Sequence, residues 1–438
     1  MDGLILQLER ILKEPQKSLP QLLDLKQKLE NLEPTLESKM IKAKVLEMLA
    51  EAKRSNEILE QSINTYLEVI HQGPEVPDAL FKQAGEECLK LLKFRGWNTQ
   101  AIRLLKLLME RFNQNEEYPK KLGLSYLSMN DNQAAKEVFE PLLNKNPEDY
   151  YVQAHLGFII KTEALEENDE EKLKRGVELM VSGIRNQPID VKNLDGLFYF
   201  HLGDGYRRLG HPEKADEIFQ IAAQRLIFPS FWQRSLYNEN GLRAQPVWSL
   251  QETGIGRQLK DIQMKWLDIK KEALTVLDAK TGGFINETEN LKDTGFWAQY
   301  DLFVQGRKNV ENCAKTPLTC SLIESIPEIA TNRRGQVKFS VMKSGTHVHP
   351  HSGPTNCRLR AHLGLQIPKV SDQGSKFKLR VADQYLSWKN GDMLVFDDSF
   401  DHEVWFESEN KNLSRLVLIM DMWHPDLTPE KRRSLTAI

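Results

Sequence analysis

Five of the ten histidines in this 438-residue chain fall within residues 347–402, at His347, His349, His351, His362 and His402. Neutral imidazole is a ligand that suits borderline transition metals such as iron(II). Three of these histidines recur at every second position, so an extended backbone is expected to aim all three toward one side. The cluster, together with the later His402, therefore predicts a transition-metal site.

The expected third ligand of such a site is missing. Proteins commonly hold non-haem iron with two histidines and one carboxylate. The acid of that pattern would stand two residues after His351, where this chain has Gly353. Either another residue binds the metal, or the metal keeps two protein ligands and an extra position for water or substrate. The nearby candidates for another ligand are His349, Asp397, Asp398 and Asp401.

Arginines of the same half could bind an anionic co-substrate. Arg358, Arg360 and His362 alternate with apolar residues, so a strand would place all three on one face. Arg415 opens an otherwise apolar run, and a cation facing an apolar interior is costly without an anion. A guanidinium pairs with a carboxylate through two parallel hydrogen bonds, which is the geometry that a 2-oxoacid requires. These residues predict an anion pocket beside the histidines.

The elements that must position these side chains are short strands. Apolar and polar residues alternate in several segments after residue 336, and Asn390-Gly391 is typical of a tight turn between two strands. Such a set predicts an antiparallel sandwich or barrel, and a jelly roll is one way to close its edges. The expected strands are residues 337–342, 357–367, 377–382, 393–396 and 414–422.

The first half of the chain is expected to be helical. Its apolar residues recur at spacings of three and four, and a Leu-Gly motif repeats along it. The pattern resembles the tetratricopeptide repeat, in which a small residue lets paired helices approach each other. The motif occurs at Leu122-Gly123, Leu156-Gly157 and Leu202-Gly203, and the small-then-aromatic pairs are Ala135 with Phe139 and Ala215 with Phe219. We predict an α-plus-β multidomain protein with a helical repeat domain at 1–236 and a second domain at 237–438.

Long motifs in the second domain resemble those of aspartyl/asparaginyl β-hydroxylases. The matching segments are residues 351–365 (HSGPTNCRLRAHLGL), 396–405 (FDDSFDHEVW) and 423–428 (WHPDLT). The resemblance extends back through residues 232–238 and the repeats. It implies an iron(II)- and 2-oxoglutarate-dependent dioxygenase with a double-stranded β-helix domain of the jelly-roll, cupin-like type, which uses dioxygen to hydroxylate the β-carbon of Asp or Asn in proteins.

The resemblance also implies roles for particular residues. In that family two histidines alone hold the iron, and the glycine matched by Gly353 is the family's own departure from the triad. The implied metal ligands and catalytic residues are His351 and His402. The implied 2-oxoglutarate contacts are Ser340, Arg360, His362 and Arg415. The implied substrate contacts are Trp297, Gln299, Lys338 and Arg358.

Three positions depart from the family or add to its pattern. Thr288 stands where the family has an acidic substrate contact, which puts that contact in doubt. His349 stands where tryptophan is usual, and we expect a surface substitution rather than a third ligand. The spacing of Cys313 and Cys320 matches a disulfide of the family, and the remaining cysteines are expected to be buried.

Composition limits the partners and the compartment. The 59 basic and 62 acidic residues leave a net charge of -3, without the basic surface that nucleic acids require. No apolar run approaches the ~20 residues that span a bilayer, and the first residues lack the plan of a signal peptide. The chain is thus expected to be soluble and cytoplasmic by default, whereas the resemblance implies the endoplasmic reticulum and epidermal-growth-factor-like domains as substrates. Two rival functions stay open, a halogenase and a repeat-based adaptor whose barrel binds ligand without turnover.

Overall fold

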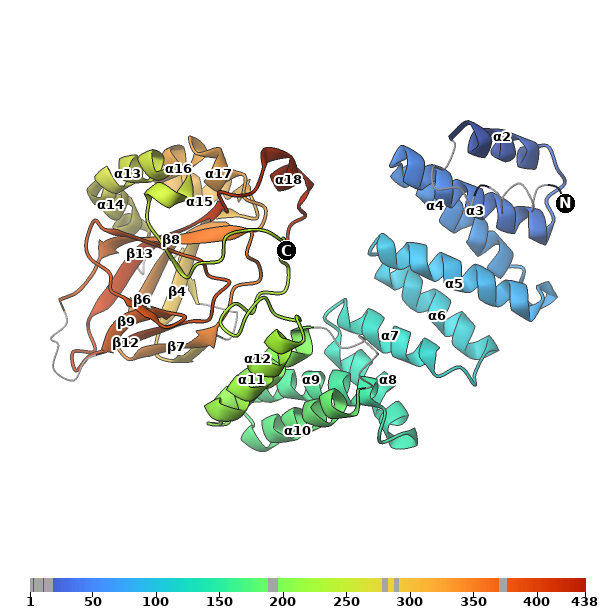
Figure 1. The fold of residues 1–438 in the computed structure, drawn as a ribbon, viewed down its shortest axis with the longest axis horizontal. Coiled ribbons are helices and arrows are strands. Elements are labelled where there is room, and N and C mark those ends of the chain that lie inside the picture. The colour runs from blue at the N-terminus through green and yellow to red at the C-terminus, as the bar shows by residue number, and fades with distance from the viewer. Residues whose placement is uncertain are drawn as a thin grey trace. The chain divides into compact units, whose positions relative to one another are not determined.

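The computed structural model describes residues 3, 11, 19–187, 196–277, 283–286, 291–369 and 376–438. It divides into two compact units, Met1–Asn193 and Leu194–Ile438. One unit is helical and the other combines helices with antiparallel sheets, so the predicted α-plus-β architecture is confirmed (Figure 1). The domain boundary after residue 236 stays a prediction. The compact units divide earlier in the chain, so helices α11 and α12 belong to the second unit.

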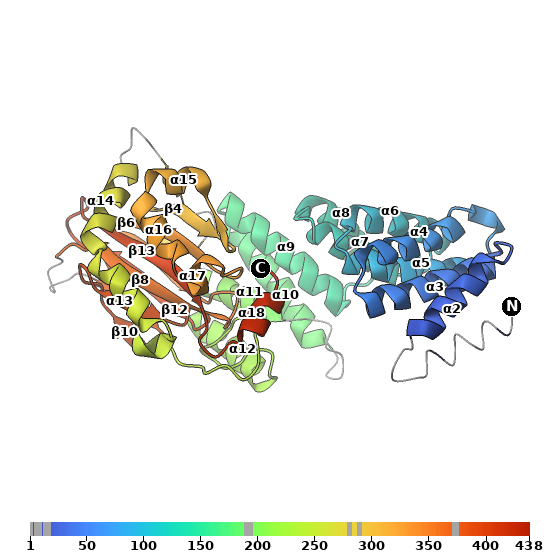
Figure 2. The same ribbon diagram turned by 90° about the horizontal axis from the view of Figure 1, so that it is seen from above.

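The helical unit consists of antiparallel pairs, as the tetratricopeptide-like motifs predict (Figure 2). Glycines allow the close approach within a pair: a Cβ on Gly157 would lie 2.7 Å from the Gly176 carbonyl oxygen of the next helix. Gly123 likewise leaves room for the ring of Phe139, since a Cβ there would lie 2.5 Å from the ring. Its helices are α2 (Leu19–Glu30), α3 (Leu36–Lys53), α4 (Asn56–Ile70), α5 (Asp78–Phe94), α6 (Asn98–Arg111), α7 (Glu117–Leu127), α8 (Asn132–Lys145), α9 (Tyr150–Glu167) and α10 (Glu170–Asn186).

The second unit contains a helix pair, a layer of short helices and a larger set of strands. The pair is α11 (Gly196–Arg208) and α12 (Pro212–Gln224), and the other helices are α13 (Gly256–Met264), α14 (Trp266–Leu277), α15 (Val310–Lys315), α16 (Pro317–Glu324), α17 (Pro327–Ala330) and α18 (Pro429–Ser434). The strands are β1 (Val247–Trp248), β2 (Ile285–Asn286), β3 (Lys292–Thr294), β4 (Trp297–Val304), β5 (Arg307–Lys308), β6 (Gln336–Lys343), β7 (Thr346–His351), β8 (Arg358–Gln366), β9 (Lys376–Val381), β10 (Gln384–Leu386), β11 (Met393–Phe396), β12 (His402–Glu407) and β13 (Ser414–Trp423).

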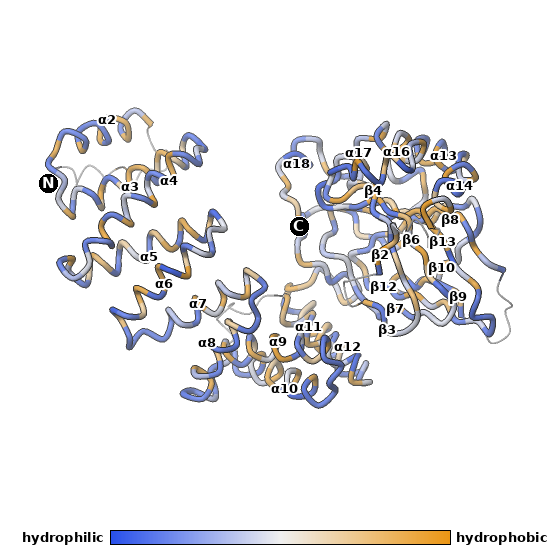
Figure 3. The backbone as a smooth tube through the Cα atoms, turned by 180° about the vertical axis from the view of Figure 1, so that it is seen from behind, coloured by the Kyte–Doolittle hydropathy of each residue, from blue (hydrophilic) through white to orange (hydrophobic). Residues whose placement is uncertain are grey.

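These strands form two antiparallel sheets. Within the described ranges the larger sheet runs β1-β11-β8-β13-β6-β4-β2, with β5 paired to β4, and the smaller one runs β10-β9-β12-β7-β3. The five predicted strands are all present, and they supply the centre of the larger sheet and part of the smaller one. Hydrophobic positions, orange in Figure 3, gather along the central strands β6, β8 and β13.

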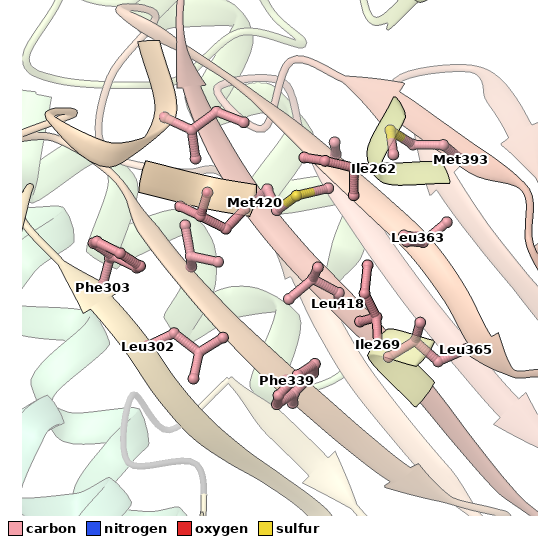
Figure 4. Close-up of a cluster of buried hydrophobic side chains, with 14 of the residues drawn as sticks. Ile262, Ile269, Leu302, Phe303, Phe339, Leu363, Leu365, Met393, Leu418 and Met420 are labelled. Carbon is pink, nitrogen blue, oxygen red and sulfur yellow. The ribbon is translucent and has the colours of Figure 1, made fainter. Parts of the chain in front are cut away.

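The larger sheet has one face covered by helices. Leu363 and Leu418 point from its central strands toward Ile262 of α13 and Ile269 of α14, in the cluster drawn in Figure 4. Because side chains alternate along a strand, the intervening residues of β8, β13, β6 and β4 lie on the opposite, inner face. That face carries the arginines and His362, as the alternation in the sequence predicted.

A second core lies between the two sheets. Val417 and Phe396 of the larger sheet pack there with Leu379 and Val404 of the smaller one. The inner face of the larger sheet is therefore screened from water by the smaller sheet over part of its area. The polar residues described below share this inner face with the apolar core.

Cys313 and Cys320 form a disulfide that joins α15 to α16, as the resemblance implied. The other two cysteines, Cys88 and Cys357, are buried thiols, as expected. Among the helices that the structure describes, none is long and apolar enough to span a bilayer.

Candidate metal and anion site

His351 and His402 lie side by side on adjacent strands of the smaller sheet. His351 ends β7, His402 begins β12, and the two residues are register partners with ring centroids 4.1 Å apart. The Nδ1 of His351 lies 2.7 Å from the carbonyl oxygen of His349, and the Nδ1 of His402 lies 2.9 Å from that of Phe400. A carbonyl oxygen can only accept, so each Nδ1 carries a proton, and in the neutral form of each ring the lone pair is on Nε2. This is the tautomer in which histidines bind metals.

The imidazole of His402 is available as a neutral ligand. Burial, and then the neighbouring His351, lower the pKa of His402 well below its ordinary value, so this imidazole is neutral. Within the described part of the chain, no third histidine, cysteine or carboxylate completes a metal-binding set with these two residues. The assignment of His351 and His402 as the metal ligands stays a prediction.

The prediction that His347, His349 and His351 all point to one side is wrong. The register between β7 and β12 shifts near His402, where two residues of β7 oppose one of β12. Such a bulge turns the chain locally and re-aims a side chain. His347 stacks on Trp405 and lies with His349 beside a separate cavity, whereas His351 lines the cavity that contains His402. His349 therefore lies on the outer side of the sheet, away from the candidate metal position.

The carboxylate of Asp398 occupies the space into which a side chain at position 353, the acid position of the usual triad, would extend. The backbone N–H of Gly353 donates to the carbonyl oxygen of Asp398 at 2.6 Å. A Cβ on Gly353 would lie 2.5 Å from the Asp398 carboxylate, so alanine or aspartate there must displace a buried charged group. Burial alone would raise the pKa of Asp398, but the guanidinium groups of Arg358 and Arg360 outweigh it and lower the pKa.

Two of the predicted ligand-binding arginines are paired with carboxylates of the protein. Nη2 of Arg358 lies 2.6 Å from Asp398, and Arg360 binds both oxygens of Asp421 at 2.7 and 2.9 Å. Asp421 was not among the predicted site residues, although a lone acid within the apolar run 416–422 is a signal for a buried partner. The charges at this end of the site are therefore largely balanced within the protein.

Arg415 is the opposite case. Its side chain is 2% exposed, and its Nε and Nη1 have no hydrogen-bond partner in the part of the chain that the structure describes. The guanidinium lies over the ring of Trp388, 4.4 Å from the ring centre. Burial lowers the pKa of Arg415 to about 9. A buried cation with unsatisfied donors is costly, so this position is suited to a bound anion.

His362 connects this arginine with the histidine pair. Trp388 donates its indole N–H to Nδ1 of His362 at 3.2 Å, so the proton of the neutral ring is on Nε2. Burial, followed by the charge of Arg415, lowers the pKa of His362 well below its ordinary value. Phe396 contacts both His362 and His402, with ring centroids at 5.1 and 5.6 Å. The sequence analysis also missed Trp388, whose only signal is an indole just before the Asn390-Gly391 turn.

The remaining predicted residues form two polar pairs on β4 and β6. Trp297 donates its indole N–H to the hydroxyl of Ser340 at 3.0 Å. Lys338 donates to the side-chain oxygen of Gln299. Thr288 lies outside the described residues.

The structure brings six of the ten predicted site residues together around one cavity of about 500 Å³. They are His351, His402, Arg358, Arg360, Lys338 and Trp297. Ser340, His362, Arg415 and Gln299 do not line this cavity but lie on the same inner strand faces. The arrangement combines a pair of metal-competent histidines with a buried, unsatisfied cation.

A sandwich of antiparallel sheets, in a chain that also carries tetratricopeptide-like helices, defines a two-part protein whose β domain contains the candidate site. Residues 263–425 match the family model described as Aspartyl/Asparaginyl beta-hydroxylase. The second unit belongs to this family, and the similarity continues into the helices. Human aspartyl/asparaginyl beta-hydroxylase is 43% identical over 91% of this chain and 50% of its own length, and the mouse protein is 43% identical over 91% and 51%.

The chain spans about half the length of these curated relatives. A relative named for a different activity is the ornithine lipid ester-linked acyl 2-hydroxylase of Rhizobium tropici, 33% identical over 31% of this chain and 44% of its own length. The chain also aligns with the crystal structure of YrrB, a tetratricopeptide repeat protein, at 14% identity and a TM-score of 0.32 over 46% of this chain and 91% of that one. At that level the alignment carries no argument.

Proposed function

We propose that this protein is an iron(II)- and 2-oxoglutarate-dependent dioxygenase that hydroxylates the β-carbon of Asp or Asn residues in proteins. The observation that carries the proposal is Arg415, a buried cation whose donors Nε and Nη1 lack partners within the described residues. A dicarboxylate reaching from the histidine pair toward Arg415 would satisfy these donors. The family of the second unit supports the same conclusion.

His351 and His402 would hold the metal through their Nε2 atoms. Iron(II) in that position supplies the chemistry by which dioxygen oxidises 2-oxoglutarate to succinate and carbon dioxide and inserts one oxygen atom into substrate. Gly353 leaves the third protein position without a ligand, and the ionised Asp398 lies beside it. A second anion, such as the chloride of a halogenase, would face this carboxylate, which favours hydroxylation over halogenation.

The co-substrate would lie along the inner face of the larger sheet. Arg415 would pair with the distal carboxylate through two parallel hydrogen bonds. On β8, His362 would donate its Nε2 proton to the co-substrate. On β6, which pairs with the Arg415 strand β13, Ser340 would offer its hydroxyl. Arg360 already donates two hydrogen bonds to Asp421, so it would contribute positive charge to the co-substrate site rather than a second pair of hydrogen bonds. Trp388 covers the Arg415 guanidinium and limits the access of water to it.

The protein substrate would enter from the cavity. Its lining includes Arg358, Lys338 and Trp297, two of which are cationic, which suits the carboxylate of an aspartate side chain. Gln299 orients Lys338 by accepting its hydrogen bond. By family resemblance we extend the proposal to epidermal-growth-factor-like domains as substrates and to a double-stranded β-helix as the class of the two sheets. The Cys313–Cys320 disulfide supports an oxidising compartment, for which the endoplasmic reticulum is our proposal.

The test is a peptide assay with the purified chain, iron(II) and 2-oxoglutarate. The expected result is a mass gain of one oxygen, mapped to Asp or Asn in an epidermal-growth-factor-like peptide, with one succinate formed per oxygen inserted. A chlorinated product would identify a halogenase. Binding of the peptide without succinate would identify the adaptor instead.

A further inference from the structure

A single arginine of α11 touches the residues that precede both candidate metal ligands. Nη1 of Arg207 lies 3.0 Å from Oδ1 of Asp401 and 3.3 Å from the carbonyl oxygen of Pro350. Asp401 directly precedes His402, and Pro350 directly precedes His351. One guanidinium nitrogen therefore links the side chain of Asp401 to the backbone of Pro350, the two residues that precede the histidines.

Asp401 is held from several elements. Its carboxylate is fully buried and accepts from Arg234, and Nη2 of Arg380 on β9 lies 2.9 Å from its other oxygen. Its backbone N–H donates to the carbonyl oxygen of Trp232 at 2.6 Å, and its own carbonyl accepts from Ala382 at 2.8 Å. With so many partners, this residue has little freedom to move unless its arginines move. The start of β12 is thus fixed in position just before His402.

The side chain of Arg207 packs within the helix pair α11 and α12. The guanidinium of Arg207 lies 5.1 Å from the ring centre of Phe219 on α12, and that of Arg234 lies 4.0 Å from the same centre. Gly203 has no side chain, and a Cβ there would collide with this ring. Gly203 and Phe219 are the glycine and the aromatic residue of the third repeat motif. The packing typical of a tetratricopeptide pair therefore places the arginine.

We propose that Arg207 is a positioning residue that sets the spacing of His351 and His402, so that α11 and α12 are part of the metal site. The inference rests on the proposed function in that it takes these histidines as the metal ligands. Two imidazoles can share one ion only if both Nε2 atoms lie about 2 Å from it, so a small displacement of either backbone weakens binding. Arg207 itself touches neither histidine ring nor substrate.

The test compares variants of the full chain, freed of metal, in titrations with manganese(II). Arg207→Met keeps an aliphatic stem over Phe219 but removes the donors to Asp401 and Pro350. We expect it to weaken manganese(II) binding about 10–100-fold, the range for partners behind the metal ligands. The matched control is Arg208→Met, which removes the same charge from the next position, where Arg208 pairs with Asp204 of its own helix at 3.0 and 3.1 Å. This control is expected to bind manganese(II) as the unmodified chain does.

The outcomes separate the two proposals. If the unmodified chain fails to bind manganese(II), the metal site of the proposed function is wrong. If it binds and Arg207→Met binds equally well, only the positioning role is wrong.

Should Arg207→Met not fold, Arg207→Lys decides, because it leaves a cation opposite Asp401 but does not reproduce the guanidinium nitrogen Nη1 that contacts both partners. Several-fold weaker binding at an unchanged unfolding temperature supports the role, and unchanged affinity overturns it. The visible spectrum of the cobalt(II)-loaded protein provides an independent readout of ligand geometry, and it is expected to change in Arg207→Lys but not in Arg208→Met.

Discussion

Two arginines on the inner face of the same sheet are treated differently by the fold. Arg360, near the histidine pair, is bound by both oxygens of Asp421 and lies 3.3 Å from Asp398. Arg415, on the neighbouring strand β13, is more deeply buried, lies against an indole ring and has donors without partners in the described ranges. The protein neutralises charge at the metal end and leaves it uncompensated at the Arg415 end. The difference separates charges that are paired within the protein from one that we propose pairs with a bound ligand.

The largest effect is expected from the metal end itself. His351→Ala and His402→Ala each leave a single protein ligand, because no other described residue completes the set. We expect each variant to lose manganese(II) binding and turnover, measured by titration and by succinate release. Full activity in either variant would contradict the assignment of these histidines as metal ligands. The contrast between a metal end at Arg360 and an anion end at Arg415 would then no longer hold.

Removing a carboxylate from the balanced end should cost stability. Asp398→Asn keeps the shape of the side chain but leaves Arg358 and Arg360 with less compensation in a buried position. Breaking a buried ion pair by removing one partner costs about 3–5 kcal/mol. Denaturation by urea, followed by circular dichroism, measures this loss. A variant as stable as the unmodified chain would show that the charges at this end are less desolvated than the structure indicates.

Removing the uncompensated cation Arg415 should lower the affinity for 2-oxoglutarate without lowering the stability of the fold. Arg415→Met deletes a buried charge without orphaning a protein carboxylate among the described residues, so its stability is expected to be unchanged or higher. Its apparent affinity for 2-oxoglutarate should fall by the ~1.5–3 kcal/mol of a charged hydrogen bond, roughly 10–100-fold. Arg415→Lys should restore only part of this affinity, because an ammonium does not reproduce the paired donors. An unchanged requirement for 2-oxoglutarate in Arg415→Met would place the anion site elsewhere, with Arg360 as the next candidate.

A smaller effect concerns Asp397, which neighbours Asp398 at the balanced end. Burial raises the pKa of Asp397 to about 8, and Oδ1 accepts from the Ser399 hydroxyl at 2.5 Å. Since the unfolded carboxyl has a pKa near ~3.9, the folded state binds more protons between these values, and stability falls as pH rises toward 8. We expect the unfolding temperature of Asp397→Asn to depend less on pH across this window. Equal slopes for the two proteins would mean that Asp397 is ionised when folded.

The smallest effect is expected at a position outside both ends. His349 lies on the outer side of the smaller sheet, beside the cavity that contains Arg380 and Glu403. His349→Trp should therefore leave manganese(II) affinity and turnover within about twofold of the unmodified chain, since surface substitutions away from a site change free energies by ~0.5 kcal/mol or less. A large loss of metal affinity would make His349 a ligand.

The sequence by itself determined which residues of β8 share a face. Side-chain direction alternates along any strand, so Arg358, Arg360 and His362 were separable from the apolar residues between them. The spacing of the leucine-glycine motifs identified the helix pairs for a similar reason, because helical periodicity is local. Residue type and spacing also identified the histidine cluster as a candidate metal site, whereas the choice of His351 and His402 as its ligands came from the family resemblance and stays a prediction.

Only the tertiary structure decided which of these charges are balanced and where the third histidine of the cluster points. Arg360 meets Asp421 because β8 and β13 are neighbours in register, a pairing between residues 61 positions apart. The bulge opposite His402 turns His351 inward and breaks the alternation that the sequence suggests. Register and bulges depend on contacts between distant strands, and no local pattern of residue types encodes those contacts.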